Sequence, residues 1–442
     1  MHQLQRKRKR HASIFGKVST LDTPPDNHKD IMESSPSLEL AKHALLMFGT
    51  ILAAGTLSGL IARLARIPDV VVFLLVGMLL GPSVFGLVDI KADSTINQLI
   101  LIFGASYILF DGGASIKLKV LKEVWITIVV ISTVGVLITA AITGVAAWYF
   151  LGLAPIVALL LGTVIASTDP ATLVPVFKQI HIKDRVAQTV MSESAFNDAM
   201  GAILTFTVLG VAVGTGGFSM GEALLDLLKQ SLLGIVIGGM LGYLAALLIS
   251  HDRFGFLAEF APVVTLMAVI AAYMGADGMH ASGFMAVFVF GIMIGNQGSL
   301  GFKLARLEVK QLEDFVMTTA LIMRMFIFIL LGAQVDFSLM NQYLFGGAAV
   351  VAVFMLVARP ATVFLCALPD RRAKWSFKEM LFMCWTRETG VIPGALAGML
   401  VGMKAPGAHI IASVTFIAIL MTILIQATTT KWLARKLGLL VE

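Results

Sequence analysis

Residues Val124 to Leu153 form the run VWITIVVISTVGVLITAAITGVAAWYFLGL, in which no side chain is charged. A helix needs about 20 apolar residues to cross the hydrocarbon core of a bilayer, so this run is long enough to span it. The whole chain is 58% hydrophobic and only 14% charged, which excludes a soluble globular protein. No alternating pattern of barrel strands occurs, and we therefore expect an all-α polytopic membrane protein.

Thirteen apolar segments are expected to span the membrane: about 44–64, 70–87, 97–113, 124–151, 154–178, 187–214, 221–250, 257–275, 280–297, 317–334, 343–368, 378–403 and 408–434. The loops after odd-numbered spans hold nearly all loop Lys and Arg residues, whereas the opposite loops hold only Lys91 and Lys404. This asymmetry predicts a cytoplasmic C-terminus and an extracytoplasmic N-terminus. Segment 300–316 is amphipathic, and we expect it to lie at the membrane interface.

The polar N-terminal segment 1–40 contains the basic cluster RKRKR at 6–10 and is predicted to be disordered. The membrane domain then extends over 41–436. An odd number of spans favours two inverted six-helix repeats, spans 1–6 and 8–13, joined by span 7. Spans 5 and 12 then correspond. Both carry polar residues and a proline in mid-run, which predicts two interrupted helices that unwind at Asp169 and Ile392.

Two polar motifs lie inside predicted spans, namely STDP at 167–170 and SESAFND at 192–198. Ionisable groups at membrane depth are costly, and a cluster of them indicates a pathway for ions or protons. Residues four positions apart stack on one side of a helix, so the second motif forms one polar stripe. A structural polar network that holds helices together is the alternative interpretation.

Oxygen ligands suit hard monovalent cations, and the two motifs supply several of them. Asp198 with Ser194, facing Thr168, is a candidate cage for Na⁺, K⁺ or Li⁺. Two neighbouring buried carboxylates do not both stay ionised without compensation. We expect Asn197 to donate hydrogen bonds to Asp169 and keep it anionic. Asp198 is then the group that binds either a proton or a cation, which is sufficient for antiport.

A buried guanidinium also needs a partner, because an unpaired charge in an apolar run is very costly. We expect Arg359 to pair with Glu193; pairing with Asp169, or a position near the membrane surface, are the alternatives. Arg387 and Glu388 are predicted to form a second charged pair at the break in span 12. This second pair is either a gate or purely structural.

Asp111 lies at the cytoplasmic end of span 3 and is a candidate relay on the approach to the site, or else a solvated charge at a helix end. Arg324 on span 10 either pairs with Asp111 or extends to the membrane interface. Cys366 and Cys384 lie in or beside apolar runs and are expected to be small buried side chains. We expect no cofactor and no metal apart from transported cations.

At these motifs the chain resembles the monovalent cation:proton antiporter-1 family, the NhaP-type exchangers related to eukaryotic Na⁺/H⁺ exchangers. The similarity extends over about 40–436. It implies an NhaA/NapA-like antiporter fold and a homodimer. An elevator-like core of spans 4–6 and 11–13, about 124–214 and 343–434, would move against a dimerisation domain of spans 1–3 and 8–10, about 44–113 and 257–334. Span 7, 221–250, would link them.

The resemblance also implies roles for individual residues. Asp198 would be the shared carboxylate, with Ser194 and Thr168 as further ligands, and Asp111 would be the family's acidic residue on span 3. Having Asn197 before that aspartate is the mark of the electroneutral branch. Many relatives carry Gly-Leu-Arg-Gly in span 12, whereas this chain has WTRETG at 385–390, so Arg387 matches only loosely.

Electroneutral exchange of Na⁺ or Li⁺ for protons at the cell membrane, with a role in pH homeostasis, is therefore the expected function, and the protein is a transporter and not an enzyme. A K⁺/H⁺ antiporter or a K⁺ efflux system is the alternative, although the latter usually carries a nucleotide-sensing tail. A sodium-coupled organic solute carrier is less favoured. An intramembrane aspartyl protease would need Tyr-Asp and Gly-x-Gly-Asp motifs, which are absent. Cations, protons and lipid are the expected partners, and nucleic acid is not.

Overall fold

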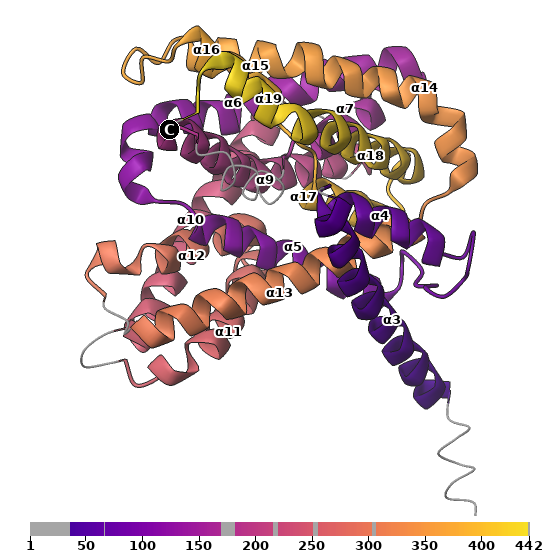
Figure 1. Ribbon diagram of the computed structural model, residues 1–442, viewed down its shortest axis with the longest axis horizontal. Helices are drawn as coiled ribbons and strands as arrows, with labels where there is room; N and C mark the ends of the chain where they lie inside the picture. The colour runs from indigo at the N-terminus through magenta and orange to yellow at the C-terminus, as the bar shows by residue number, and fades with distance from the viewer. Residues whose placement is uncertain are drawn as a thin grey trace, which may run out of the picture. The chain divides into compact units, whose positions relative to one another are not determined.

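The computed structural model describes residues 36–65, 67–168, 182–214, 220–250, 255–302 and 306–440, and these are almost entirely helical (Figure 1). In these ranges, nine helices are long and apolar enough to cross a membrane, and four shorter apolar helices accompany them. The only β pairing among the described residues is an isolated antiparallel bridge between Ile182 and Leu440. The predicted all-α membrane fold is confirmed.

The described α-helices are α3 (Pro36–Ala65), α4 (Asp69–Leu80), α5 (Thr95–Ala114), α6 (Leu118–Leu151), α7 (Pro155–Ile165), α9 (Asp184–Ala212), α10 (Met220–Ser250), α11 (Ala261–Gly278), α12 (Gly283–Gly295), α13 (Arg306–Ala333), α14 (Phe337–Val353), α15 (Arg359–Ala367), α16 (Phe377–Trp385), α17 (Val391–Gly402), α18 (Ala408–Thr422) and α19 (Thr428–Leu437). Each of the thirteen predicted segments overlaps one or more of these helices, although the segment predicted at 154–178 is described only as far as Thr168. That all thirteen cross the bilayer stays a prediction, as does their division into core and dimerisation parts.

Two units make up the chain, Met1–Gly49 and Thr50–Glu442, and helix α3 begins in the first and ends in the second. The predicted disordered tail at 1–40 lies mostly outside the described residues. Its last part is helical, because α3 already begins at Pro36. Proline is favoured at the first position of a helix, where its missing N–H would have no partner.

One segment end differs from the sequence prediction. The helix expected over 70–87 ends at Leu80, because Pro82 pushes Gly81 into an extended conformation. The position of the amphipathic segment 300–316 at the membrane interface stays a prediction. From Arg306 onward this segment is the start of α13, since no glycine or proline interrupts the chain until the end of that helix.

Span 12 is interrupted, as predicted, but the position of the break differs. Helix α16 ends at Trp385 and α17 begins at Val391, so the break covers residues 386–390 and not Ile392. Pro393 falls in the first turn of α17, where helix N–H groups have no intrahelical acceptor, so it does not unwind the chain there. Span 5 is described only to Thr168, and the expected unwinding at Asp169 lies outside the described residues.

Spans 11 and 13 each contain a short π-helix. One, Phe354–Ala358, lies between α14 and α15 and directly precedes Arg359-Pro360. The other, Ile423–Ala427, lies between α18 and α19. A proline removes one N–H from the helical ladder, which explains the first; π-helical turns are frequent at functional sites.

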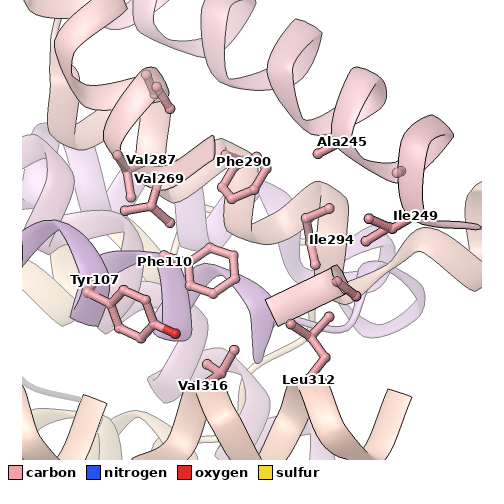
Figure 2. Close-up of a cluster of buried hydrophobic side chains, with 14 of the residues drawn as sticks. Tyr107, Phe110, Ala245, Ile249, Val269, Val287, Phe290, Ile294, Leu312 and Val316 are labelled. Carbon is pink, nitrogen blue, oxygen red and sulfur yellow. The ribbon is translucent and has the colours of Figure 1, made fainter. Parts of the chain in front are cut away.

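Aromatic packing fixes the helix that carries the second motif. Phe110 of α5 stacks on Phe290 of α12 with ring centroids 5.3 Å apart, inside a buried apolar cluster that also includes Tyr107 (Figure 2). From α9, Phe196 meets Phe288 of α12 edge to face at 4.7 Å. Since Phe196 lies within the motif at 192–198, this contact holds the motif's helix against α12.

Candidate ion-binding site in the membrane

Helix α9 carries the motif at 192–198, and its polar side chains are buried although the helix is long enough to cross a membrane. Glu193 and Ser194 each expose 2% of their surface, Asn197 exposes none and Asp198 exposes 3%. The four-residue spacing places Ser194 one turn before Asp198 on the same side of the helix. The sequence-predicted polar stripe is therefore a feature of the interior and not a solvated face.

Thr168, just beyond the end of α7, joins this stripe. Its backbone N–H donates to Asn197 Oδ1 over 3.1 Å, and Asn197 Nδ2 donates to Thr168 Oγ1 over 2.8 Å. The hydroxyls of Thr168 and Ser194 lie 2.8 Å apart. The structure thus brings together Thr168, Ser194 and Asn197 from two helices, with Asp198 one turn further along.

This arrangement explains why the chain leaves helical geometry after α7. The last described N–H of the segment finds its acceptor in the Asn197 amide, so an amide side chain replaces the lost helical hydrogen bond. Asn197 was expected to serve Asp169 instead. Asp169 lies outside the described residues, and so does the expected contact between Asn197 and Asp169.

Glu193 and Arg359 form a buried bidentate ion pair. Both nitrogen–oxygen distances are 2.7 Å, and Arg359 Nε donates to the Met383 carbonyl over 2.9 Å. Asn197 Nδ2 adds a hydrogen bond to Glu193 over 3.3 Å. A bidentate pair with further hydrogen bonds to both partners is the arrangement that makes burial of two charges tolerable. The predicted pairing is present, and with 1% of its surface exposed Arg359 does not extend to the interface.

Arg387, in the break of span 12, is held in another way. Its guanidinium donates to Thr139 Oγ1 over 3.4 Å and to the carbonyl of Ala166, and it lies 5.5 Å from the Phe354 ring centroid. The predicted ion pair with Glu388 is wrong: no such pair occurs among the described residues. The Arg387 side chain is directed instead toward Thr139, Ala166 and the Phe354 ring.

The Ala166 carbonyl belongs to the C-terminal end of α7, where helix carbonyls lack intrahelical partners. A cation is favourable at this end of a helix. Arg387 therefore compensates the end of α7 close to Thr168. Sequence reasoning missed this contact because a backbone carbonyl leaves no mark in the sequence; a loosely matched arginine in a broken span was the only signal.

Other predicted residues lie around this centre. Asp111 is half-buried on α5, and its neighbour Gly112 has Ala195 of α9 directly opposite its Cα. Helix α5 therefore packs beside the motif. Arg324 is half-buried on α13, and the described residues contain no ion pair between it and Asp111. Cys366 and Cys384 are buried and free, as expected.

Comparisons with known proteins agree with this arrangement. The family model described as sodium/hydrogen exchanger, transmembrane, matches residues 49–436. The chain belongs to the sodium/hydrogen exchanger family. Among its relatives in that family, the Na(+)/H(+) antiporter 1 of Methanocaldococcus jannaschii is 32% identical over 423 residues, covering 89% of this chain and 96% of the relative.

Other exchangers resemble the chain over a similar range. The K(+)/H(+) antiporter NhaP of Alkalimonas amylolytica is 29% identical over 91% of this chain and 68% of its own length. The solved structure of the sodium proton antiporter MjNhaP1 from Methanocaldococcus jannaschii at pH 8 has a TM-score of 0.78 and 31% identity. It covers 89% of this chain and 99% of that chain. The family resemblance seen in the sequence motifs is confirmed.

Proposed function

We propose that this exchanger-family protein moves Na⁺ or Li⁺ against protons across the cell membrane, with Asp198 as the carboxylate that binds either ion. The observation that supports this most is the meeting of the Thr168 and Ser194 hydroxyls, 2.8 Å apart, one helical turn from Asp198 in a fully buried setting. Two hydroxyls and one carboxylate are oxygen ligands of the kind that hard cations prefer.

Burial of Asp198 makes the proton and the cation compete for its carboxylate. A buried carboxylate is favoured when it is either protonated or paired with a cation, because both states reduce its charge in the protein interior. Asp198 therefore holds one ion or the other, which couples the two fluxes. Glu193 does not compete for these ions, because Arg359 already neutralises it at 2.7 Å.

The amide of Asn197 supports an electroneutral exchange. An amide carries no proton to exchange, so the pair of residues at 197 and 198 contributes a single titrating group. One proton then leaves for each cation bound. Asp111, on the helix that packs beside the motif, is proposed as a relay toward the site, and the C-terminus is proposed to lie in the cytoplasm.

Secondary active transport by alternating access fits the broken span 12, since interrupted helices at a membrane-buried polar site are typical of transporters. In the elevator-like scheme, α6, α7, α9 and α14 to α19 would move against the remaining helices. A homodimer is part of this proposal.

The test is proton exchange in proteoliposomes that contain a pH-sensitive dye, with Na⁺, Li⁺ and K⁺ added in turn. Wild-type protein should respond to Na⁺ and Li⁺, and Asp198→Asn should lower the exchange rate at least about 100-fold. Glu313→Gln, which removes an exposed carboxylate of α13, is the matched control and should exchange normally. Exchange that persists in Asp198→Asn would contradict the proposed role of Asp198.

Potassium is the second candidate ion, because a relative that is 29% identical is named a K(+)/H(+) antiporter. A response to K⁺ that exceeds the response to Na⁺ would favour it. Stoichiometry is tested in the same vesicles by clamping the membrane potential at several values. Electroneutral exchange should change its rate less than about twofold, since no net charge crosses the membrane.

A further inference from the structure

The break in span 12 lies against the last span of the protein. Trp385 Nε1, at the end of α16 just before the break, donates to Thr429 Oγ1 over 2.8 Å. Thr389 N–H, near the end of the break, donates to Thr422 Oγ1 over 3.0 Å. The break therefore passes antiparallel along the last span from Thr429 back to Thr422.

Gln426 lies between these two contacts on the same side of the last span, four positions after Thr422 and three before Thr429. Its side chain is completely buried, in the π-helical turn Ile423–Ala427. Neither atom of its amide group has a hydrogen-bond partner among the described residues, and the Thr389 hydroxyl has none there either. An unsatisfied amide in the protein interior is costly, so such a group marks a place where something else binds.

Glu388 completes the set. It directly precedes Thr389, lies between the two residues of the break region that contact the last span, Trp385 and Thr389, and exposes none of its surface. A carboxylate, an amide oxygen and a hydroxyl together offer three kinds of oxygen ligand. The amide Nε2 is then free to donate to a carboxylate oxygen or to water.

We propose that Gln426, Thr389 and Glu388 bind a second monovalent cation, separate from the ion at Asp198. The two sites share no residue: the first uses α7 and α9, and the second uses the break and the last span. Arg387, which precedes Glu388, turns away toward Thr139 and Ala166. The choice of a monovalent cation rests on the proposed function, whereas the existence of the site rests on the unsatisfied amide.

Equilibrium binding of Tl⁺ to purified protein in detergent, at alkaline pH, counts the ions bound per chain. Wild type should bind two and Asp198→Asn one. Gln426→Met, of similar volume but without the amide, should also bind one. Gln426→Glu, which keeps a polar group of the same size and adds a charge, should bind two, the second at least about threefold more tightly. Thr143→Val, which removes a buried hydroxyl of α6 elsewhere, is the control and should bind two.

The outcomes separate the two proposals. If Asp198→Asn binds two ions and Gln426→Met binds one, the second site stands and the role of Asp198 falls. One ion in wild type that is lost in Asp198→Asn would overturn the second site, and so would two ions in Gln426→Met. Thermal unfolding of each variant checks folding. Should Gln426→Met fail to fold, Gln426→Glu decides alone, because an unchanged second affinity in that variant contradicts the proposal.

Discussion

Arg359 and Arg387 each expose 1% of their surface, yet different chemistry holds them. Arg359 meets a carboxylate with two bonds of 2.7 Å and a backbone carbonyl with its third nitrogen. Arg387 meets a hydroxyl, a carbonyl and an aromatic face. Two guanidinium groups in the same membrane interior are thus stabilised in one case by a counter-ion and in the other by neutral dipoles.

The difference separates a charge that a direct counter-ion neutralises, that of Arg359, from a charge that has no direct counter-ion, that of Arg387. Glu193 neutralises Arg359 directly at 2.7 Å, so the two residues together carry no net charge. Arg387 has no carboxylate within ion-pair distance in the described part of the chain, and the charges of Arg359, Glu193 and Asp198 act on it from further away. Its charge is therefore free to favour the ionised form of Asp198 when the proton has left.

The largest expected effect is on stability, from breaking the Glu193–Arg359 pair. Glu193→Gln leaves a buried guanidinium without a counter-ion and should destabilise the protein by about 3–5 kcal/mol. Thermal unfolding in detergent measures this loss. The double variant Glu193→Leu with Arg359→Met removes both charges and should recover most of it. Equal stability of Glu193→Gln and wild type would refute the stabilising role of this ion pair.

A smaller stability effect and a larger transport effect are expected from Arg387→Met. Only hydrogen bonds to neutral groups are lost, which should cost about 1–3 kcal/mol. Exchange should fall at least about tenfold, because Asp198 loses the positive charge that favours its ionised form. Arg387→Lys keeps the charge and should exchange faster than Arg387→Met in the dye assay. A methionine variant that exchanges at the wild-type rate would remove the distinction between the two arginines.

Loss of a ligand should be distinguishable from loss of charge. Thr168→Val and Ser194→Ala each remove one hydroxyl of the pair that lies 2.8 Å apart. Each should raise the KM for Na⁺ about tenfold, equivalent to about 1.4 kcal/mol, with a smaller change in maximal rate. Initial rates over a range of Na⁺ concentrations provide the measurement. A fall in maximal rate with unchanged KM would place the cation elsewhere.

The smallest expected effect concerns Asp370, a charged residue in the loop between α15 and α16 that, like Arg387, is held by neutral groups. Asp370 accepts from Thr127 Oγ1 over 2.5 Å and from the N–H groups of Arg372 and Ala373 over 3.1 Å. Burial by itself raises the pKa of Asp370, but these hydrogen bonds outweigh it and lower the pKa below its ordinary 3.8. Neutral donors hold this anion, as neutral acceptors hold Arg387.

A carboxylate with a lowered pKa stabilises the fold above its ordinary pKa, and this contribution is lost as the pH falls through the lowered value. Asp370→Asn should therefore cost about 1 kcal/mol near neutral pH, and the difference from wild type should shrink once the pH drops below about 4. Thermal unfolding of both proteins over a pH series provides the test. A difference that stays constant into acid would show that shape, and not charge, matters at this position.

Much of the candidate site followed from the sequence, because charge at membrane depth permits few solutions. A guanidinium in the apolar run around Arg359 is costly without a counter-ion, and Glu193 on a buried stripe was the favoured partner. Helical spacing alone placed Ser194 beside Asp198. Because an unpaired buried charge is costly, the sequence indicated Glu193 as the partner of Arg359.

What the sequence did not predict depends on groups without a distinctive signal. The partner of Arg387 is a backbone carbonyl, which every residue has. The break before α17 was misplaced because a proline ends one helix or begins the next with equal ease, and Pro393 does the second. The amide of Gln426 lacks a hydrogen-bond partner among the described residues because of how its neighbours pack, which no sequence pattern encodes.

The bridge between Ile182 and Leu440 has a practical consequence. Lys183 N–H also donates to the Leu439 carbonyl over 3.3 Å, so the residues just before α9 and just after α19 are joined through their backbones. The segment before α9 and the segment after α19 are therefore held together. A reporter attached after Leu440 would therefore lie beside the N-terminal end of α9, the helix that carries the motif at 192–198.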